Sequence, residues 1–389
     1  MNGEKDKPYK YWLMNVKGFG KKRKLFLLQK FGSAEEIFAA KEKVLFAAAG
    51  ETVAGKIQES KKDWDILAEY EKLREQKIKF TCYGDSDYPD RLSEIPDAPF
   101  ALYYQGHLPS DEIPAVAIIG ARACSEYGVY AAKEFGSKLA GMGIQIISGL
   151  AMGIDGIAQE AALEACGESF GILGCGVDIC YPKSNRHLYE RCKKQGGILS
   201  EYPPGTMPKA AFFPPRNRII SGLSDIVVVV EAREKSGTLI TVDMALEQGR
   251  EVLAVPGRIT DSLSRGCNRL FRQGAGVAVC PLDIVEALSH LRYPFNIEET
   301  AKKRGMQTAP GLDNVSAKVL SPQEKQVYEQ LEILPQTPEE IWGKAGMALT
   351  IQEVMGILVE LCLKGFAEAC PEGYCQKILA SPKKLLYSG

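Results

Sequence analysis

Short apolar runs alternate with segments of helix length between residues 113 and 292. The runs are AVAIIG, IQIISG, SFGILG, GGILSE, IVVVVEA, EVLAVPG and VAVC. This alternation is typical of βαβ units and predicts an α/β fold with a doubly wound, mostly parallel sheet. The run at 226–230 has no polar position, as expected for a strand that is covered on both faces and lies at the sheet centre.

The pattern changes outside this region and predicts further parts. Apolar positions at helical spacing predict a small helical module over 1–75. Proline-broken strands at 80–106 extend the sheet or pack on its edge, so the sheet domain is expected to span 76–292. Residues 293–315 are polar without apolar periodicity and predict a linker. Three helices and a two-stranded hairpin fit 316–389, which is the element order of a winged-helix-like domain.

The helix expected over 350–363 would take the recognition position of such a domain. It has no basic residue before Lys364, and it carries Glu353 and Glu360. Because carboxylates repel phosphate groups, the sequence favours a protein-contact or regulatory role for this domain over DNA reading.

Positive charge is concentrated in two zones, although the formal net charge is −1. Residues 7–30 hold eight Lys or Arg and no acid. Residues 202–224 hold Lys209, Arg216 and Arg218, again without an acid. Phosphate binding needs local positive potential, so it is expected in these zones.

The first basic zone contains VKGFGKKRKLFLLQKFGS, which has the outline of a helix-hairpin-helix element. Gly18 and Gly20 would form the hairpin and leave backbone N–H groups free for a phosphate. Four basic residues would surround this turn: Lys21, Lys22, Arg23 and Lys24. A helix with a solvated basic face explains the same residues equally well, and both interpretations stay open.

Glycine-rich turns follow the expected strands, at the sheet edge where open α/β proteins bind ligands. After the first strand, Gly120 permits close backbone approach and Arg122 supplies a guanidinium group suited to phosphate. Gly149 belongs to the next turn, and Asp155 is expected as the N-cap of the helix that follows. Tight packing of strand against helix is an alternative role for Gly120 and Gly149. The turn at 236–238 opens another helix and would also suit a phosphate.

The segment AAFFPPRNRIISG interleaves aromatic and basic residues, namely Phe212, Phe213, Arg216 and Arg218. Aromatic platforms beside cations suit a single strand, because each unpaired base offers a π-face. This segment is the strongest physical indication of nucleic acid in the sequence. The alternative is a loop anchored by buried aromatic side chains, with a salt-bridged arginine.

Several catalytic and nucleotide-binding classes are disfavoured. GETVAGKI resembles a P-loop but has no Ser or Thr after Lys56, and GCGVDI lacks the third glycine of a dinucleotide fingerprint. The histidines at 107, 187 and 290 lie outside the glycine-rich turns, so no Ser/His/Asp triad is expected. The eleven cysteines form no CxxC pair. We therefore expect binding without catalysis, with no cofactor and no metal.

The chain begins with MNGEKDKPYKYWLM, which is charged, and no stretch approaches the roughly 18 apolar residues of a membrane span. Reduced, buried thiols are expected for the scattered cysteines. These features predict a cytoplasmic protein without a membrane partner.

Seven motifs follow one another over roughly 115–276. They are IIGARACSEYG, SGLAMGIDGIAQEAAL, LGCGVDICYPKSNRHLY, LSEYPPGTMP, FFPPRNRIISGLSD, VVEAREKSGTLIT and QGREVLAVPGRITDSLSRGCNRLFRQGA. In this order they resemble the DNA-processing protein A (DprA/Smf) family. The resemblance implies an extended Rossmann-like domain that forms a homodimer, binds single-stranded DNA in a basic pocket and helps load RecA recombinase in natural transformation.

Individual positions match this family or depart from it. Arg122 matches the family's arginine after the first strand, and FFPPRNR matches its basic aromatic segment. Gln159 stands where histidine is frequent, and Ala121 where serine is common. Neither departure removes a cation, so DNA binding is still expected.

Two other functions stay open. A nucleoside monophosphate phosphoribohydrolase would share the general fold, but KSGTLITVD lacks the double glycine and the following glutamate of that class. A duplex-DNA regulator acting through the winged-helix-like domain is disfavoured by the acidic helix.

The residues expected to bind DNA or phosphate are Gly120, Arg122, Ser148, Gly149, Gly153, Lys183, Asn185, Lys209, Phe213, Arg216, Asn217, Arg218, Ser236, Gly237 and Thr238. A second contact is expected at Gly18, Gly20, Lys21 and Lys22.

Overall fold

The computed structural model describes residues 2–291 and five stretches of the C-terminal part, which are 321–332, 336–345, 349–364, 366–370 and 373–376. The chain divides into two compact units, Met1–Arg304 and Gly305–Gly389. The linker expected over 293–315 lies outside the described residues. Among the residues described, none of the helices combines the length and apolarity that crossing a membrane requires.

Within the described residues, a nine-stranded sheet forms the frame of the first unit, in the order β1-β2-β6-β5-β4-β3-β7-β8-β9. Its strands are β1 (Lys79–Cys82), β2 (Ala101–Gly106), β3 (Ala115–Ile119), β4 (Gln145–Ser148), β5 (Ser169–Ile172), β6 (Gly196–Ser200), β7 (Ile226–Val229), β8 (Glu251–Ala254) and β9 (Gly276–Val277). The strands from β6 to β9 in this order pair in parallel, whereas β1 and β2 add an antiparallel edge beside β6. The predicted α/β fold with a mostly parallel sheet is confirmed.

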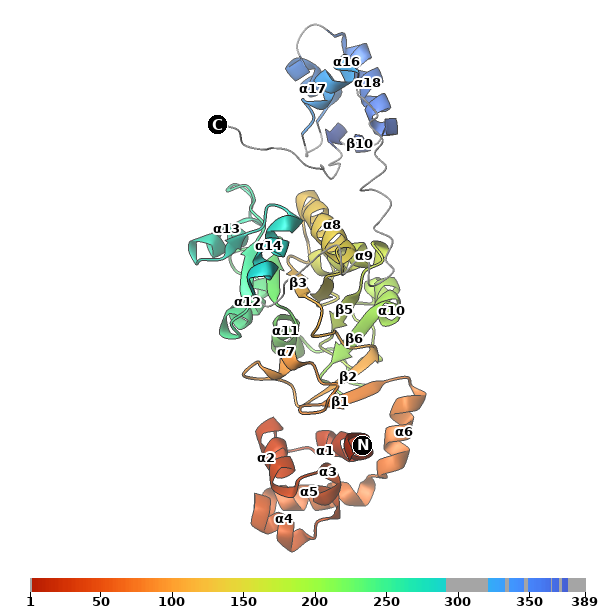
Figure 1. Cartoon of the computed structure of the whole chain (residues 1–389), viewed down its shortest axis with the longest axis vertical. Coiled ribbons are helices and arrows are strands. Elements are labelled where there is room, and N and C mark those ends of the chain that lie inside the picture. Colours follow the sequence, from red (N-terminus) through yellow and green to blue (C-terminus); the bar gives the residue numbers. More distant parts are fainter. Residues whose placement is uncertain are drawn as a thin grey trace. The chain divides into compact units, whose positions relative to one another are not determined.

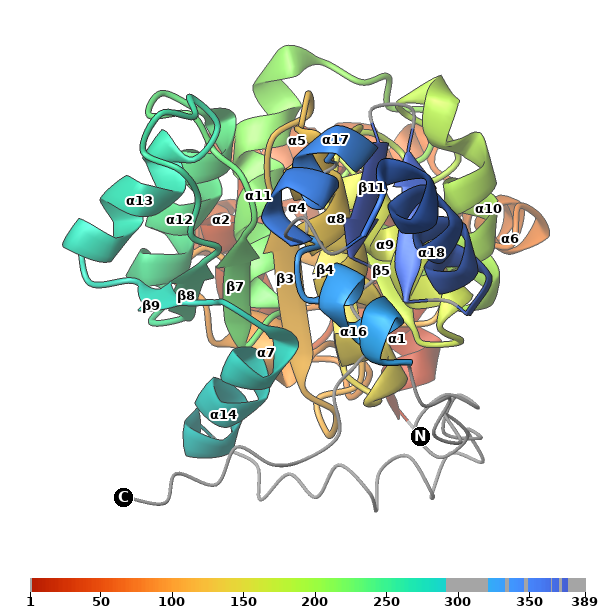
Figure 2. The same ribbon diagram turned by 90° about the horizontal axis from the view of Figure 1, so that it is seen from above.

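Helices connect these strands. They are α7 (Asp90–Ser93), α8 (Glu126–Gly141), α9 (Ile154–Glu164), α10 (Arg186–Lys194), α11 (Phe213–Gly222), α12 (Gly237–Glu247), α13 (Arg265–Arg272) and α14 (Pro281–Leu291). Short 3-10 helices, η1 (Lys183–Asn185) and η2 (Ala210–Phe212), precede α10 and α11. Figures 1 and 2 show α12 and α13 at the β8 end of the sheet and α10 at the β6 end.

Apolar residues of the strands alternate between two cores. Val116 and Ile118 of β3 pack in a core that contains residues of α8 and α9, whereas Ala117 and Ile119 pack in a core with residues of α11, α12 and α13. Both faces are therefore covered, which explains strands that are apolar without alternation. The run at 226–230 contains β7 and is buried as predicted, but its expected central place is wrong, because β7 is third from one edge.

The N-terminal helices are α1 (Asn2–Asn15), α2 (Lys21–Phe31), α3 (Ala34–Ala39), α4 (Glu42–Ala49), α5 (Glu51–Asp63) and α6 (Ile66–Glu75). They share a hydrophobic core with the antiparallel edge of the sheet. The ring centroid of Tyr11 in α1 lies 5.5 Å from that of Phe80 in β1. Lys7 Nζ lies 2.9 Å from a carboxylate oxygen of Asp87. The domain boundary expected after residue 75 stays a prediction.

The second unit contains helices α16 (Pro322–Tyr328), α17 (Pro338–Ala345) and α18 (Ile351–Lys364), then strands β10 (Ala367–Cys370) and β11 (Gly373–Gln376). The two strands pair antiparallel, and the helices share a small apolar core. Glu353 and Glu360 are exposed on α18. Hydrogen bonds from the N–H and hydroxyl of Thr350 hold the pKa of Glu353 below its ordinary value, so this carboxylate is charged at neutral pH. The winged-helix interpretation stays a prediction.

Candidate nucleic-acid interface

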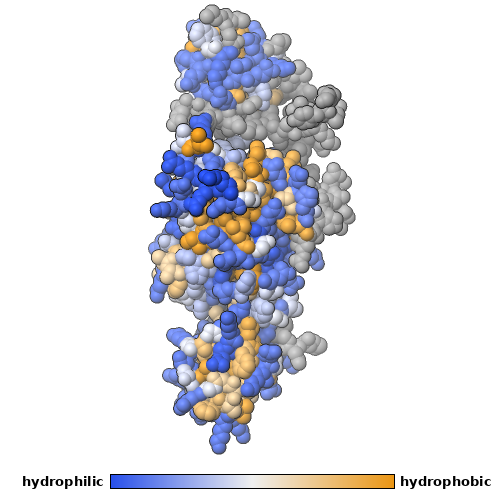
Figure 3. Space-filling model, turned by 90° about the vertical axis from the view of Figure 1, so that its left-hand side faces the viewer, coloured by the Kyte–Doolittle hydropathy of each residue, from blue (hydrophilic) through white to orange (hydrophobic). Residues whose placement is uncertain are grey.

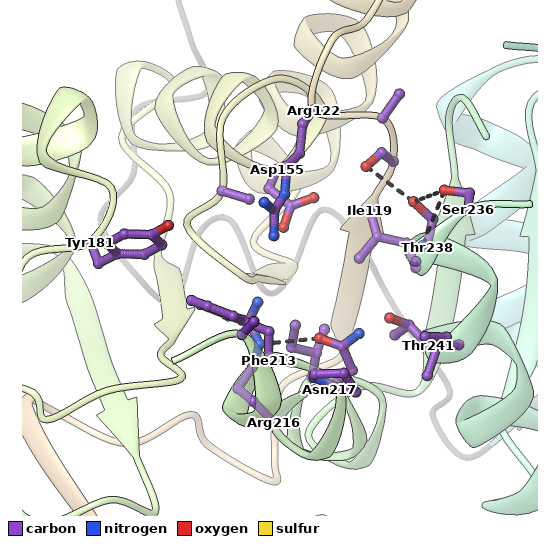
Figure 4. A pocket seen from close by; sticks show the side chains of 18 of the residues that line it. Ile119, Arg122, Asp155, Tyr181, Phe213, Arg216, Asn217, Ser236, Thr238 and Thr241 are labelled. Atoms are coloured by element: carbon purple, nitrogen blue, oxygen red, sulfur yellow. Dashed lines mark hydrogen bonds between the residues drawn. The ribbon is translucent and has the colours of Figure 1, made fainter. Parts of the chain in front are cut away.

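The strand order changes direction between β3 and β7, which are neighbouring parallel strands. The strands that follow β3 lie on one side of it, and those that follow β7 lie on the other. Ligands of open α/β sheets bind beyond the carboxyl ends of the strands at such a point. A cavity of about 620 Å³ lies there, lined by residues from the end of β3 and from α9, α11 and α12 (Figure 4).

Helix α12 begins at this cavity. The Ser236 hydroxyl oxygen accepts a hydrogen bond from the Thr238 N–H (3.2 Å), and the Thr238 hydroxyl donates to the Gly120 carbonyl at the end of β3 (3.2 Å). The Leu239 N–H donates to the Ser236 carbonyl (3.1 Å). Among the described residues this leaves the Gly237 N–H of the first turn without a partner, and nothing crowds Gly237. This helix start therefore suits an anion. Exposed Lys235 adds positive charge; it was not predicted, although it directly precedes the predicted turn.

Arg122 lies on the loop after β3 with its side chain exposed. Its guanidinium carbon lies 5.9 Å from the ring centroid of Phe213. Figure 4 shows the two residues on opposite walls of the cavity. Within the described residues Arg122 has no ion-pair partner, so its charge is available to a ligand.

An aromatic pair lies at the same cavity. The ring centroids of Tyr181 and Phe213 are 5.4 Å apart, with an angle of 33° between the rings. Tyr181 is 41% exposed, so part of its ring is open to a stacking partner. Phe212 stacks instead on Tyr202, with centroids 4.5 Å apart. Tyr181 was not predicted as a binding residue; the available signal was the basic stretch that follows it at 183–186.

Arg216 and Asp155 are buried on either side of Gly149. The Arg216 guanidinium donates to the carbonyls of Gly149 (2.8 Å) and Ile172, and to the side-chain oxygen of Asn217 (3.1 Å). The Asp155 carboxylate accepts from the Gly149 N–H (3.1 Å). Burial lowers the pKa of Arg216 to about 10, and burial raises the pKa of Asp155, while the opposite charge opposes each shift. Arg216 is therefore charged at neutral pH, but the protein itself occupies most of its donors.

The expected N-cap role of Asp155 is wrong, because Gly153 is the N-cap of α9 and Asp155 lies in the first turn. Gly153 has a φ of 77°, and a Cβ there would lie 2.3 Å from the Ala121 carbonyl oxygen. A Cβ at Gly149 would lie 2.7 Å from the Asp155 carboxylate. The buried Ser148 hydroxyl donates to a carbonyl of β3 (2.6 Å). Gly153 lets the start of α9 approach the loop after β3, and Gly149 lets the end of β4 approach Asp155 of α9. Close packing of strand against helix is the alternative left open for Gly149.

Other predicted residues lie outside the lining of this cavity. The Arg218 guanidinium is paired, with Nη2 2.6 Å from Glu201 and Nε 3.1 Å from Asp97. The alternative of a salt-bridged arginine therefore describes Arg218. The Asn185 amide donates to two carbonyls of the loop after β4, each at 3.0 Å. Two lysines are exposed and stay candidates for DNA contact: Lys183 and Lys209.

Two basic residues of the N-terminal turn make contacts within the protein itself. Lys21 Nζ donates to the Ala98 carbonyl and lies 4.7 Å from the ring centroid of Tyr83. Lys24 is buried and donates to the Met14 carbonyl. The other two basic residues, Lys22 and Arg23, are exposed. The interpretation of this helix as one with a solvated basic face is therefore wrong at Lys24, because its side chain is buried.

The glycines of this turn differ in their surroundings. Gly18 has a φ of 93°, and the Lys56 side chain covers it. Gly20 is the N-cap of α2, and no side chain caps this helix start. Phosphate contact at Gly20 and Lys22 stays a prediction.

Buried Lys24 should make stability depend on pH. Burial lowers its pKa from 10.5 to about 8. Between these two values the folded chain has released this proton and the unfolded chain still holds it, so the free energy of unfolding should rise with pH. Lys24→Met should flatten this rise. Denaturant unfolding of both proteins from pH 7 to 10 measures the difference, and parallel pH profiles would contradict the assignment.

Comparisons with known proteins show the family of this chain. Residues 79–289 match the family model described as DNA recombination-mediator protein A. The DNA processing protein DprA of Streptococcus pneumoniae is 44% identical over 217 residues, which cover 55% of this chain and 76% of that protein. Protein Smf of Escherichia coli is 38% identical over 300 residues, covering 75% of each chain. The X-ray structure of DprA from Streptococcus pneumoniae covers 74% of this chain and 98% of its own, with 34% identity and a TM-score of 0.64. The chain therefore belongs to the DNA recombination-mediator protein A family, to which it is joined both by sequence and by fold.

Proposed function

We propose that this chain binds single-stranded DNA in the cavity beyond β3 and β7. One observation carries the proposal: cations that have no ion-pair partner among the described residues, the start of a helix and an open aromatic ring line the same cavity. A phosphate would lie at the start of α12, between Lys235 and Arg122. A base would stack on Tyr181, whose ring partner is Phe213.

A single strand fits these groups better than a duplex does. In a duplex the faces of the bases are stacked on each other, so an aromatic side chain cannot reach them without unstacking. Helix starts and cations alone would serve any phosphate ligand. The open ring of Tyr181 therefore favours single-stranded DNA.

Binding without catalysis is the simpler function for this cavity. Asp155 is the one carboxylate in its described lining; it is buried, accepts a hydrogen bond from the Gly149 N–H and lies in the field of the Arg216 charge. A phosphoribohydrolase needs a carboxylate free to act on the substrate. Release of adenine from AMP would nonetheless favour the enzyme, and high affinity for a duplex operator would favour the regulator.

The partners expected from the family extend this proposal. We propose that the chain acts as a homodimer in the cytoplasm and helps load RecA recombinase on the bound strand during natural transformation. The family membership supports these roles. Exposed apolar residues near the β9 edge, Val277, Val279 and Leu282, are compatible with a second copy packing there.

Titration of purified protein with fluorescent oligo-dT tests the proposal. Binding should need no ATP and should weaken as salt rises, because each phosphate contact on a single strand contributes about 0.7 to the slope of log affinity against log salt. Tighter binding to a duplex of equal length, or binding indifferent to salt, would contradict it.

Tyr181→Ala should weaken oligo-dT binding by roughly fivefold to a hundredfold, because stacking of one base contributes about 1–3 kcal/mol. Tyr181→Phe keeps the ring and serves as the matched control. With an abasic oligonucleotide the alanine substitution should have little effect, since no base is left to stack. Equal losses on both oligonucleotides would show that Tyr181 does not stack on a base.

A further inference from the structure

A second basic hollow, the α13 hollow, lies on helix α13. It measures about 550 Å³, and its lining includes Arg265, Arg269, Arg272, Asn268 and Glu234. Spacings of four and three residues place the three arginines on one face of the helix. Figure 3 shows a strongly hydrophilic patch over α13.

The charge of the α13 hollow is not balanced by the protein. In the part of the chain that the structure describes, none of its arginines has an acidic partner. Glu234 is the one acid in the described lining, so cations outnumber it. The helix dipole favours Arg269 and Arg272 in the last turn but disfavours Arg265 at the first position. Like charges on one helix face also repel each other, and a bound anion would relieve both effects.

The α13 hollow borders the cavity beyond β3 and β7. Glu234 lines the hollow, and the next residue, Lys235, lines the cavity. The Gly266 N–H in the first turn of α13 donates to the Ala232 carbonyl (2.8 Å), which attaches α13 to the same loop. Arg233 is exposed on this loop. Positive charge therefore continues from the cavity across the loop to α13.

We propose that the α13 hollow binds a second stretch of the phosphate backbone of the single strand held in the cavity. The proposal rests on the proposed function and deepens it. A strand leaving the cavity at Lys235 passes Arg233 and reaches the three arginines. No aromatic side chain belongs to the described lining of the hollow, so the contact is to phosphates and adds affinity without sequence preference.

The test compares a short oligo-dT, too short to reach α13 when it fills the cavity, with a long one of about 30 nucleotides. The triple variant Arg265→Gln, Arg269→Gln and Arg272→Gln should bind the short oligonucleotide as the unchanged protein does. It should bind the long one at least tenfold more weakly. The salt slope for the long one should fall by about 2, because three phosphate contacts are lost.

The control variant Arg74→Gln, Lys133→Gln and Lys325→Gln removes the same charge from separate exposed sites on α6, α8 and α16. It should bind both lengths as the unchanged protein does. Thermal unfolding checks the fold, and the single variants Arg265→Gln and Arg272→Gln repeat the test if the triple variant melts early.

Three results would overturn the proposal. If the triple variant bound the long oligonucleotide with unchanged affinity, the hollow would not contact the strand. An acidic protein surface would then be the ligand that fits the hollow. Equal losses for both lengths in folded variants would show that the hollow is no separate contact. If the unchanged protein bound neither length, the proposed function itself would fail, and this proposal with it.

Discussion

Arg122→Gln should weaken binding of oligo-dT by roughly tenfold to a hundredfold and leave the melting temperature nearly unchanged. A hydrogen bond from a charged group to a phosphate contributes about 1.5–3 kcal/mol, which corresponds to this range. The fold should depend little on this guanidinium, because it is exposed and has no ion-pair partner within the described residues. Arg122→Glu should weaken binding further, since a carboxylate repels phosphate.

The salt dependence of binding identifies what Arg122 contacts. Loss of one phosphate contact should lower the slope of log affinity against log salt by about 0.7, whereas loss of stacking at Tyr181 should leave the slope as it is. Arg74→Gln is the matched control, because Arg74 is an exposed arginine that pairs with Glu71 on α6. Unchanged affinity and slope in folded Arg122→Gln would remove Arg122 from the site.

Arg216 and Arg218 show why sequence alone could not choose among the cations of the second basic zone. They are two residues apart on α11, so they point to different sides of the helix. The window without acids, 202–224, begins one residue after Glu201, which pairs with Arg218. The other partner, Asp97, is 121 positions away in the sequence. A count of charges along the chain does not detect such partners.

The sequence predicted that the turns after the buried strands lie at one edge of the sheet, because parallel strands end at the same edge. The strand order was not predicted; it places β3 beside β7 and brings Arg122 and Ser236 to one cavity. Tyr181 reaches it from the loop after β5, whose path depends on tertiary packing, so the basic stretch at 183–186 could not by itself place this ring at the cavity.

Arg216→Met should lower the free energy of unfolding by about 3–5 kcal/mol, because it leaves Asp155 buried without its opposite charge. The carbonyls of Gly149 and Ile172 would also lose a donor. Denaturant unfolding measures the loss, and the exposed Arg122→Met is the matched control, which should change stability by less than about 1 kcal/mol. Weaker DNA binding by Arg216→Met would then reflect a damaged fold.

The pH dependence of this loss would assign it to Asp155. Burial already raises the pKa of this carboxyl, and removal of the Arg216 charge should raise it further. A carboxyl with a raised pKa binds its proton more tightly in the folded chain, so stability falls as pH rises from the unfolded pKa, about 3.9, to the folded value. Arg216→Met should therefore be less destabilised at pH 5 than at pH 8. Adding Asp155→Asn should remove this dependence and restore part of the stability. A loss that is equal at both pH values, and not relieved by Asp155→Asn, would mean that the lost hydrogen bonds, and not the unpaired carboxylate, account for the role of Arg216.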